Sequence, residues 1–196
     1  RHTRFMSVSW ARDVYKRQVL ITDRLMAGAD TRATARALAS AAEKLGPFDA
    51  VFCGCKAIDG ETGQVPGELA AALGLPCISN AEKVEAAGDE LLVTRRLEDG
   101  VQNLTVSGPA VISFSSYSYP LRLAGILGMR RARKTPVEIL TAADLGLTPE
   151  DCGLKGSLTK VVAMESRFPG LRRGPKETDL DAGVQNLRVL LREVRP

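Results

Sequence analysis

The stretch that decides the fold is FDAVFCGCKAIDGETGQVPGELAAALGLPCISN, residues 48–80. Its opening FDAVFCG (48–54) is a nearly continuous apolar run, typical of a strand buried on both faces of a parallel sheet. VPGELAAALGLP (65–76) predicts a helix that ends at its Gly-Leu-Pro, and CISN (77–80) begins the next strand. This alternation predicts an α/β fold whose parallel strands have right-handed crossovers and carry ligands at their carboxyl ends.

The residues before this stretch repeat the pattern. VLITD (19–23) is a short β-branched run and predicts a strand. A helix is predicted to follow, with Asp30 or Thr31 as its N-cap and Gly46-Pro47 as its stop. Its alanines and leucines recur at helical spacing, so one face is expected to cover the sheet.

The residues after it change character. Short alternating runs separated by Gly-Asp and Asp-Gly turns predict a β-hairpin or meander between residues 81 and 108. PAVISFSS (109–116) predicts the last apolar core strand, and 117–136 an exposed loop with one helical turn. SLTKVVAMESRF (157–168) predicts another strand, and DLDAGVQNLRVLLREV (179–194) a terminal amphipathic helix.

Three segments are expected along the chain. Residues 1–18 begin with Arg, show no periodicity and resemble translated sequencing-adapter ends, which predicts a non-native tail. The alternative is a genuine flexible N-terminal tail. Residues 19–168 are expected to form a partial nucleotide-binding α/β domain, and residues 169–196 a C-terminal linker and partner-binding helix.

Composition excludes several classes of function. The single His, at position 2, argues against a histidine base or a His-rich metal site. The four cysteines lack zinc-site spacing and indicate reduced, buried thiols and a cytoplasmic location. No apolar run reaches the roughly 18–20 residues of a membrane span. The basic clusters at 128–134 and 167–176 lack interleaved aromatics, so we expect no nucleic-acid partner.

The stretch GCKAIDGETGQVPGEL (54–68) carries the chemistry. Its glycines permit close backbone approach to a ligand, and the start of the following helix offers N–H donors to a phosphate. It is neither a Walker A loop nor a Gly-x-Gly-x-x-Gly fingerprint. On the loop alone, a nucleotide site and a plain strand-to-helix turn remain equally open.

Three landmarks occur in order and at sensible spacing: AGADTRATARALA (27–39), AIDGETGQVPGELAAALGLP (57–76), and PAVISF followed by GMRRARKTPVEILTAADLGL (109–147). Together they resemble the beta (small) subunits of electron-transfer flavoproteins. The resemblance implies a flavodoxin-like, adenine-nucleotide alpha-hydrolase-like parallel sheet with a β-hairpin and a C-terminal helical arm.

The resemblance also implies cofactors and partners. It implies a heterodimer with an alpha subunit, and FAD shared with or held by that subunit. The beta site would hold AMP, or a second FAD in the bifurcating type, which the wording Asp-Gly-Glu-Thr-x-Gln-Val (59–65) slightly favours. The chain would be an electron carrier rather than an enzyme, serving acyl-CoA or other flavin dehydrogenases.

Site residues follow from the resemblance. The phosphate-facing loop maps to Ala57, Ile58, Asp59, Gly60, Glu61, Thr62, Gly63 and Gln64, and weaker candidates are Asp30, Thr31 and Thr34. Backbone amides and the Thr62 hydroxyl would bind phosphate. Because two acids beside a phosphate are unfavourable, we expect Asp59 and Glu61 to point elsewhere.

Residues 117–134 match the family's recognition loop, which grips partner dehydrogenases through an apolar anchor. Ile126 or Leu127 would be that anchor, and Arg130, Arg131, Arg133 and Lys134 would steer an acidic partner surface. The alternative is a loop that packs Leu123, Ile126 and Met129 onto its own domain.

Two other functions compete with electron transfer. One is an adenine-nucleotide-binding sensor of the universal-stress-protein type, which shares the fold but lacks the hairpin and the recognition loop. The other is a purely structural subunit that holds its partner.

Overall fold

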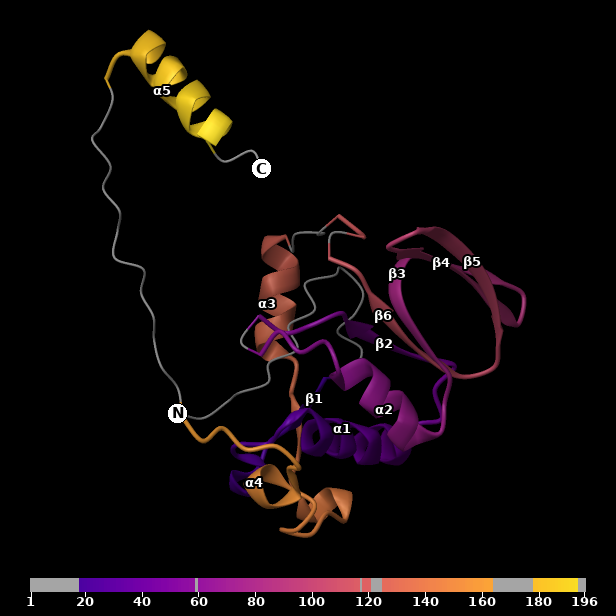
Figure 1. Cartoon of the computed structure of the whole chain (residues 1–196). Coiled ribbons are helices and arrows are strands. Elements are labelled where there is room, and N and C mark those ends of the chain that lie inside the picture. Colours follow the sequence, from indigo (N-terminus) through magenta and orange to yellow (C-terminus); the bar gives the residue numbers. More distant parts are fainter. Residues whose placement is uncertain (1–17, 59, 117, 121–124, 164–177, 194–196) are drawn as a thin grey trace. The chain divides into compact units, whose positions relative to one another are not determined.

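The structure, a computed structural model, describes residues 18–163, apart from 59, 117 and 121–124, together with residues 178–193 (Figure 1). The chain divides into two units, Arg1–Lys160 and Val161–Pro196. The predicted tail, residues 1–18, lies outside the described residues except for its last.

A five-stranded sheet forms most of the first unit. Its order is β2-β6-β3-β4-β5, with β2 and β3 each parallel to β6, β4 antiparallel to β3, and β5 antiparallel to β4. The parallel strands confirm the predicted α/β class, and the antiparallel strands confirm the predicted hairpin. The bounds are β2 Ala50–Gly54, β3 Cys77–Ala87, β4 Glu90–Leu97, β5 Gly100–Ser107 and β6 Ala110–Phe114.

A separate sheet joins β1 (Val19–Ile21) in parallel to β7 (Glu138–Leu140). The sequence predicts β1 but not β7, because three residues are too few to show a period. In the described residues β1 pairs with β7 and not with the five-stranded sheet.

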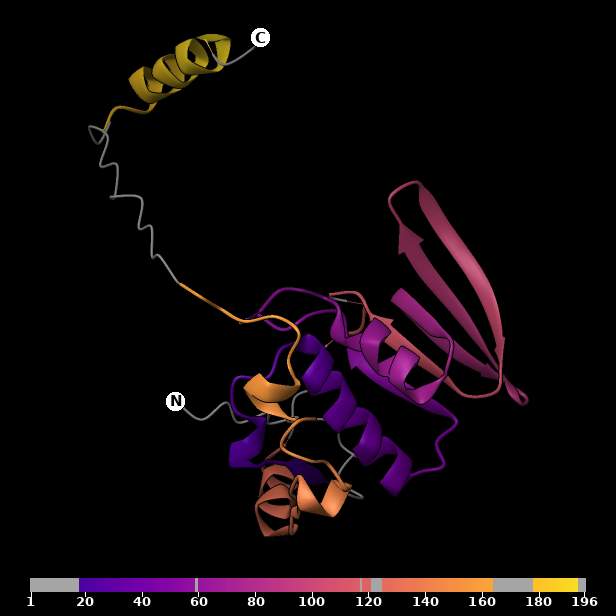
Figure 2. The same cartoon turned by 60° about the horizontal axis from the view of Figure 1, so that its bottom comes forward.

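Helix α1 (Thr31–Leu45) is buried on two sides. Ala35 and Ala39 pack with α2 (Val65–Leu73) against β2. Residues two apart lie about 200° apart around a helix, so the buried Ala33, Ala37 and Ala41 form a second, nearly opposite face. Both α1 and α2 begin and end close to the predicted residues, and α1 contacts β1 as well as α2 (Figures 1 and 2).

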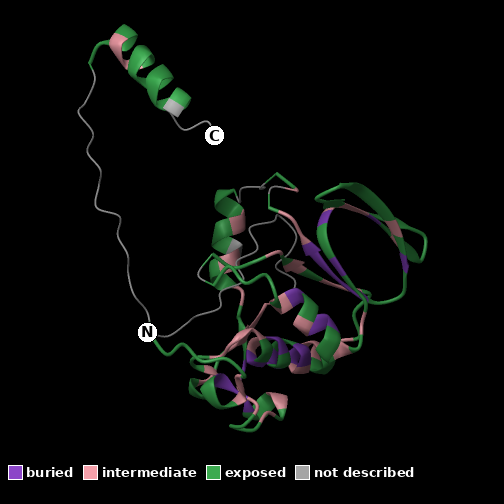
Figure 3. Cartoon of the chain, in the orientation of Figure 1, coloured by how far each residue is buried: buried purple, intermediate pink, exposed green. Residues whose placement is uncertain are grey.

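The core of the sheet lies on β6. Its residues Ala110 to Ser113 are buried, because β6 has β2 on one side and β3 on the other, as the burial colouring shows (Figure 3). Ile112 packs with Ile78, Val93 and Val106 from three strands of the hairpin region. The prediction of a core strand at 109–116 is confirmed.

One expectation for β2 is wrong. Its sequence predicts burial on both faces, but the Phe52 side chain is 58% exposed. The reason is topological: β2 pairs only with β6 among the described residues and stands at the sheet edge. Val51 and Cys53 pack against α1 and α2, while the opposite face of the strand carries Phe52.

Two further expectations are corrected. The segment 117–136 contains a helix, α3 (Ile126–Lys134), of nine residues rather than one turn. Residues 157–163 form no strand, and the remainder of the predicted strand lies outside the described residues. The sequence also does not predict three short helices, because three or four residues are too few to show a helical hydrophobic period. They are η1 Arg24–Met26, η2 Ala143–Leu145 and α4 Gly153–Gly156.

In the second unit, α5 (Leu180–Glu193) confirms the predicted terminal helix. The Asp179 side chain caps its start by accepting hydrogen bonds from the N–H groups of Asp181 and Ala182. Leu180, Val184, Leu187 and Leu191 recur at helical spacing and are all exposed. The helix is therefore amphipathic.

Candidate functional site

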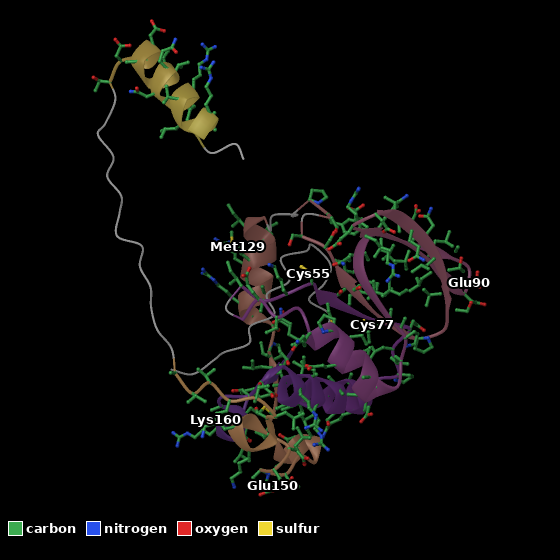
Figure 4. The ribbon with its side chains drawn as sticks, viewed as in Figure 1. Cys55, Cys77, Glu90, Met129, Glu150 and Lys160 are labelled. Carbon is green, nitrogen blue, oxygen red and sulfur yellow. The ribbon has the colours of Figure 1, made fainter. Side chains whose placement is uncertain are left out.

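The carboxyl ends of β2 and β6 meet at one edge of the sheet because these strands are parallel. Residues 55–64 follow β2, and residues 115–120 follow β6. The two segments contact each other where the Cys55 Sγ lies 3.6 Å from the Ser116 Oγ. Figure 4 labels Cys55 at this edge. The predicted nucleotide loop thus lies where parallel sheets carry ligands.

The loop 57–64 is exposed at every described residue, that is all but 59, and two of these residues have a backbone in the left-handed region. Glu61 has φ 50° and Gly63 has φ 65°, and the Glu61 N–H donates to the Ala57 carbonyl at 2.8 Å. Gly63 tolerates its φ without the strain that a side chain would add. Ile58 is 97% exposed, so it is free to meet another molecule.

Glu61 is paired within the loop. Its Oε1 lies 2.9 Å from the Lys56 Nζ, and this hydrogen bond raises the pKa of Lys56. The pair directs the Glu61 carboxylate to a neighbouring cation, as expected for an acid that must not face a phosphate. Asp59 lies outside the described residues.

The start of α2 closes the loop. Gln64 is its N-cap residue but makes no side-chain cap hydrogen bond, and Pro66 has no N–H to satisfy. The first-turn N–H groups of Val65 and Gly67 therefore have no capping side chain. Such a helix end carries partial positive charge and suits an anion.

Thr31 connects the start of α1 to this helix end. Its hydroxyl lies 3.3 Å from Gln64 Oε1 and 3.1 Å from Glu68 Oε1. Glu68 Oε2 is buried and has no hydrogen-bond partner among the described residues. Of the two threonines predicted on α1, Thr31 thus reaches the loop, whereas Thr34 lies one turn further along the helix.

Lys56 and Glu68 were missed by sequence reasoning. Both residues lie just outside the loop 57–64, and their charge could have drawn attention to them. Lys56 stands five residues before Glu61, and Glu68 lies four residues after Gln64. Neither could be assigned a partner from spacing alone, because Thr31 is 37 residues from Glu68.

We call the exposed side of α3 the α3 face, formed by Ile126, Leu127, Arg130, Arg133 and Lys134. Ile126 is 69% exposed, Leu127 71% and Met129 38%, so the alternative that Ile126 and Met129 pack onto their own domain is wrong. Helical spacing puts these five residues on one side of α3, with the small Gly128 and Ala132 on the other. Arg131 lies in α3 and Leu123 lies outside the described residues.

Two properties of the described residues bear on function. These residues contain no group of three or more His, Cys, Asp or Glu side chains that could hold a metal ion. In the same part of the chain, every helix is too short or too polar to cross a membrane.

Comparison with known proteins gives the family. The family model described as Electron transfer flavoprotein domain matches residues 11–145, a range that begins within the predicted tail. The electron transfer flavoprotein subunit beta of Thermoanaerobacterium thermosaccharolyticum is 43% identical over 171 residues, which cover 86% of this chain and 65% of the relative.

Two further relatives have different names. The Caffeyl-CoA reductase-Etf complex subunit CarD of Acetobacterium woodii is 34% identical, over 72% of this chain and 54% of its own length. Protein FixA of Azorhizobium caulinodans is 38% identical, over 84% of this chain and 60% of its own length. The chain thus spans between half and two thirds of these relatives. With the family model matched over most of its length, the chain belongs to the electron transfer flavoprotein family and is similar to its beta subunits.

Proposed function

We propose that this chain acts as the beta subunit of a heterodimeric electron-transfer flavoprotein and relays electrons from dehydrogenases through a flavin held with an alpha subunit. The observation that carries the proposal is the family match over residues 11–145 together with 43% identity to a beta subunit. A flavin, when bound, supplies one- and two-electron transfer, and the protein supplies binding, orientation and electrostatics.

The loop 57–64 is the proposed nucleotide-binding segment of this chain. Three features fit a phosphate: the uncapped start of α2, the left-handed Gly63 and the pairing of Glu61 with Lys56. The N–H groups of Val65 and Gly67 and the Thr62 hydroxyl would hold the phosphate, and Thr31 would hold Gln64 in place. The nucleotide is AMP, or FAD in a bifurcating protein.

The α3 face and α5 are the proposed contacts with other chains. Exposed Ile126 and Leu127 would anchor a dehydrogenase, and the basic residues beside them would steer an acidic surface towards it. The exposed apolar side of α5 fits the alpha subunit, since an amphipathic helix is stable when that side is covered. The four cysteines are free, which fits the cytoplasmic location that we propose, but the expectation that they are buried is wrong for Cys77, which is exposed.

The test is co-expression with an alpha subunit, followed by flavin absorbance and by quantification of AMP and FAD per heterodimer. We expect flavin in the heterodimer and loss of beta-site nucleotide in a Thr62→Ala plus Gly63→Val variant. A control, Gly88→Val, places the same strain (φ 65°) in the β3–β4 turn, away from the loop. Nucleotide content that is unchanged by the loop variant contradicts the assignment of the site.

The same measurement separates the competing functions. An adenine-nucleotide sensor would bind nucleotide without flavin and without an alpha subunit. A purely structural subunit would hold no nucleotide of its own, so the loop variant would leave the AMP and FAD content of the heterodimer unchanged.

A further inference from the structure

The carboxylate of Asp30 joins parts of the first unit that are far apart in sequence. Its Oδ1 caps α1 by accepting a 2.9 Å hydrogen bond from the Ala33 N–H. Its Oδ2 accepts from the N–H groups of Leu158, at 2.8 Å, and Thr159, at 2.9 Å. The Thr159 hydroxyl also lies 3.1 Å from Oδ2. One carboxylate oxygen therefore caps the helix, and the other binds residues 158 and 159.

Ser157 completes the connection. The Asp30 N–H donates to its Oγ at 2.8 Å, and the Ser157 hydroxyl donates to the Gly153 carbonyl at 2.6 Å. Ser157 is the C-cap residue of α4. Together Asp30, Ser157, Leu158 and Thr159 link the first turn of α1 to the end of α4, and we call them the Asp30 latch.

Among the described residues, few other contacts hold residues 158 and 159. They belong to no helix or strand, and the Leu158 side chain is 77% exposed. Burial of apolar surface therefore contributes little here, so hydrogen bonds to a charged acceptor are the main stabilising contacts. The first unit ends directly afterwards, at Lys160.

We propose that Asp30 is a positioning residue that fixes where the chain leaves the α/β unit on its way to α5, independently of its role as helix cap. The latch itself rests on the hydrogen bonds of Asp30 with Ser157, Leu158 and Thr159. Its consequence for alpha-subunit binding rests on the proposed function: the latch holds residues 157–159 where the first unit ends, and α5, the proposed alpha-subunit contact, follows later in the chain.

Substitution can separate the cap from the latch. Asp30→Asn retains an oxygen that can cap Ala33, but its NH₂ group cannot accept from Leu158 and Thr159. Asp30→Ala removes both functions. Asp144→Asn is the matched control, because Asp144 accepts from Thr141 and makes no hydrogen bond to the latch.

The test is hydrogen exchange of the full chain, read at single amides by NMR. In Asp30→Asn we expect the Leu158 and Thr159 amides to exchange about tenfold faster, while the Ala33 amide stays protected. Asp144→Asn should leave all three amides unchanged. Unchanged protection of Leu158 and Thr159 in a folded Asp30→Asn protein overturns the proposal.

A second measurement needs no variant and covers the case in which Asp30→Asn does not fold. In an acid titration of the wild-type chain, the amide shifts of Leu158, Thr159 and Ala33 should move with one midpoint, that of the Asp30 carboxyl. Latch amides that do not follow this midpoint also overturn the proposal. The proposed function is tested separately, by nucleotide content in the Thr62→Ala plus Gly63→Val variant, so the failure of either test here is distinguishable from its failure.

Discussion

The Thr31 hydroxyl, in the first turn of α1, lies 3.1 Å from Oε1 of Glu68, in the first turn of α2. The two residues are 37 positions apart, and their contact brings the beginnings of two helices together beside the loop 57–64. Asp30, next to Thr31, contacts residues 157–159. The first turn of α1 therefore touches both the candidate nucleotide loop and the end of the α/β unit.

Replacing Thr31 by Val should destabilise the chain by about 1 kcal/mol, since a partly buried hydrogen bond to a carboxylate is lost without a change of shape. Glu68 would then have no partner on either oxygen among the described residues. Urea unfolding measures the change. Thr105→Val, at an exposed position of β5, is the control and should change stability much less.

Gly153→Ala should be severely destabilising, by more than about 2 kcal/mol, because it combines two penalties. Gly153 has φ 53°, and a Cβ added there would lie 2.2 Å from the Leu25 carbonyl oxygen. Gly146→Ala is the matched control: its φ is 65° but nothing lies within 4 Å of the added atom. The control should cost only about 1–2 kcal/mol. Equal melting temperatures for the two variants would show that α4 does not pack closely on η1.

Stability should fall in acid because of Asp30 and Asp151. At Asp30 burial acts to raise the pKa, but hydrogen bonds from Ala33, Thr159 and Leu158 outweigh it and lower the pKa below 3.8. At Asp151 the hydrogen bonds from Thr148 lower the pKa below the same value. A lowered folded-state pKa stabilises the fold at every pH above the unfolded value, and this contribution is lost as pH falls through the folded value.

The contribution of these two groups to the urea midpoint should therefore be fully present and constant between pH 7 and about 5, and should be lost progressively below about pH 4. The Asp30→Asn and Asp151→Asn variants should show a shallower decline than the wild type. An equally steep decline in both variants would assign acid sensitivity to other groups.

Leu127→Asp should weaken binding to a dehydrogenase without lowering the melting temperature, because this side chain is 71% exposed. Arg130→Glu plus Arg133→Glu should slow association, and the effect should diminish at high salt. Arg24→Glu, an exposed basic position on η1, is the control. Surface plasmon resonance at two salt concentrations gives both rates. Association that is independent of salt would exclude steering by the α3 face.

Several parts of the fold could be predicted because their signal is local. Alanines and leucines at helical spacing, the Asp30 cap and the Gly46 stop predict α1 within one residue. The apolar run AVISF predicts β6, and two glycine turns predict the hairpin. The site was predictable only as a segment: the loop 57–64 follows a strand and precedes a helix, and both are local facts.

The remainder depended on contacts between distant residues. The exposure of Phe52 follows from the edge position of β2, which no apolar run reveals. The pairing of Thr31 with Glu68, and of Asp30 with Leu158 and Thr159, joins residues brought together by folding.

The sequence by itself determined the α/β class, the positions of the long helices and strands, and the loop that begins at the end of β2. These follow from the hydrophobic period and from the backbone preferences of Gly, Pro and capping residues, which act over a few positions. Only the tertiary structure decided which strands pair, which face of β2 is exposed, and which side chains meet at the first turn of α1. Those outcomes depend on long-range packing and on hydrogen bonds whose partners are separated by up to 129 residues.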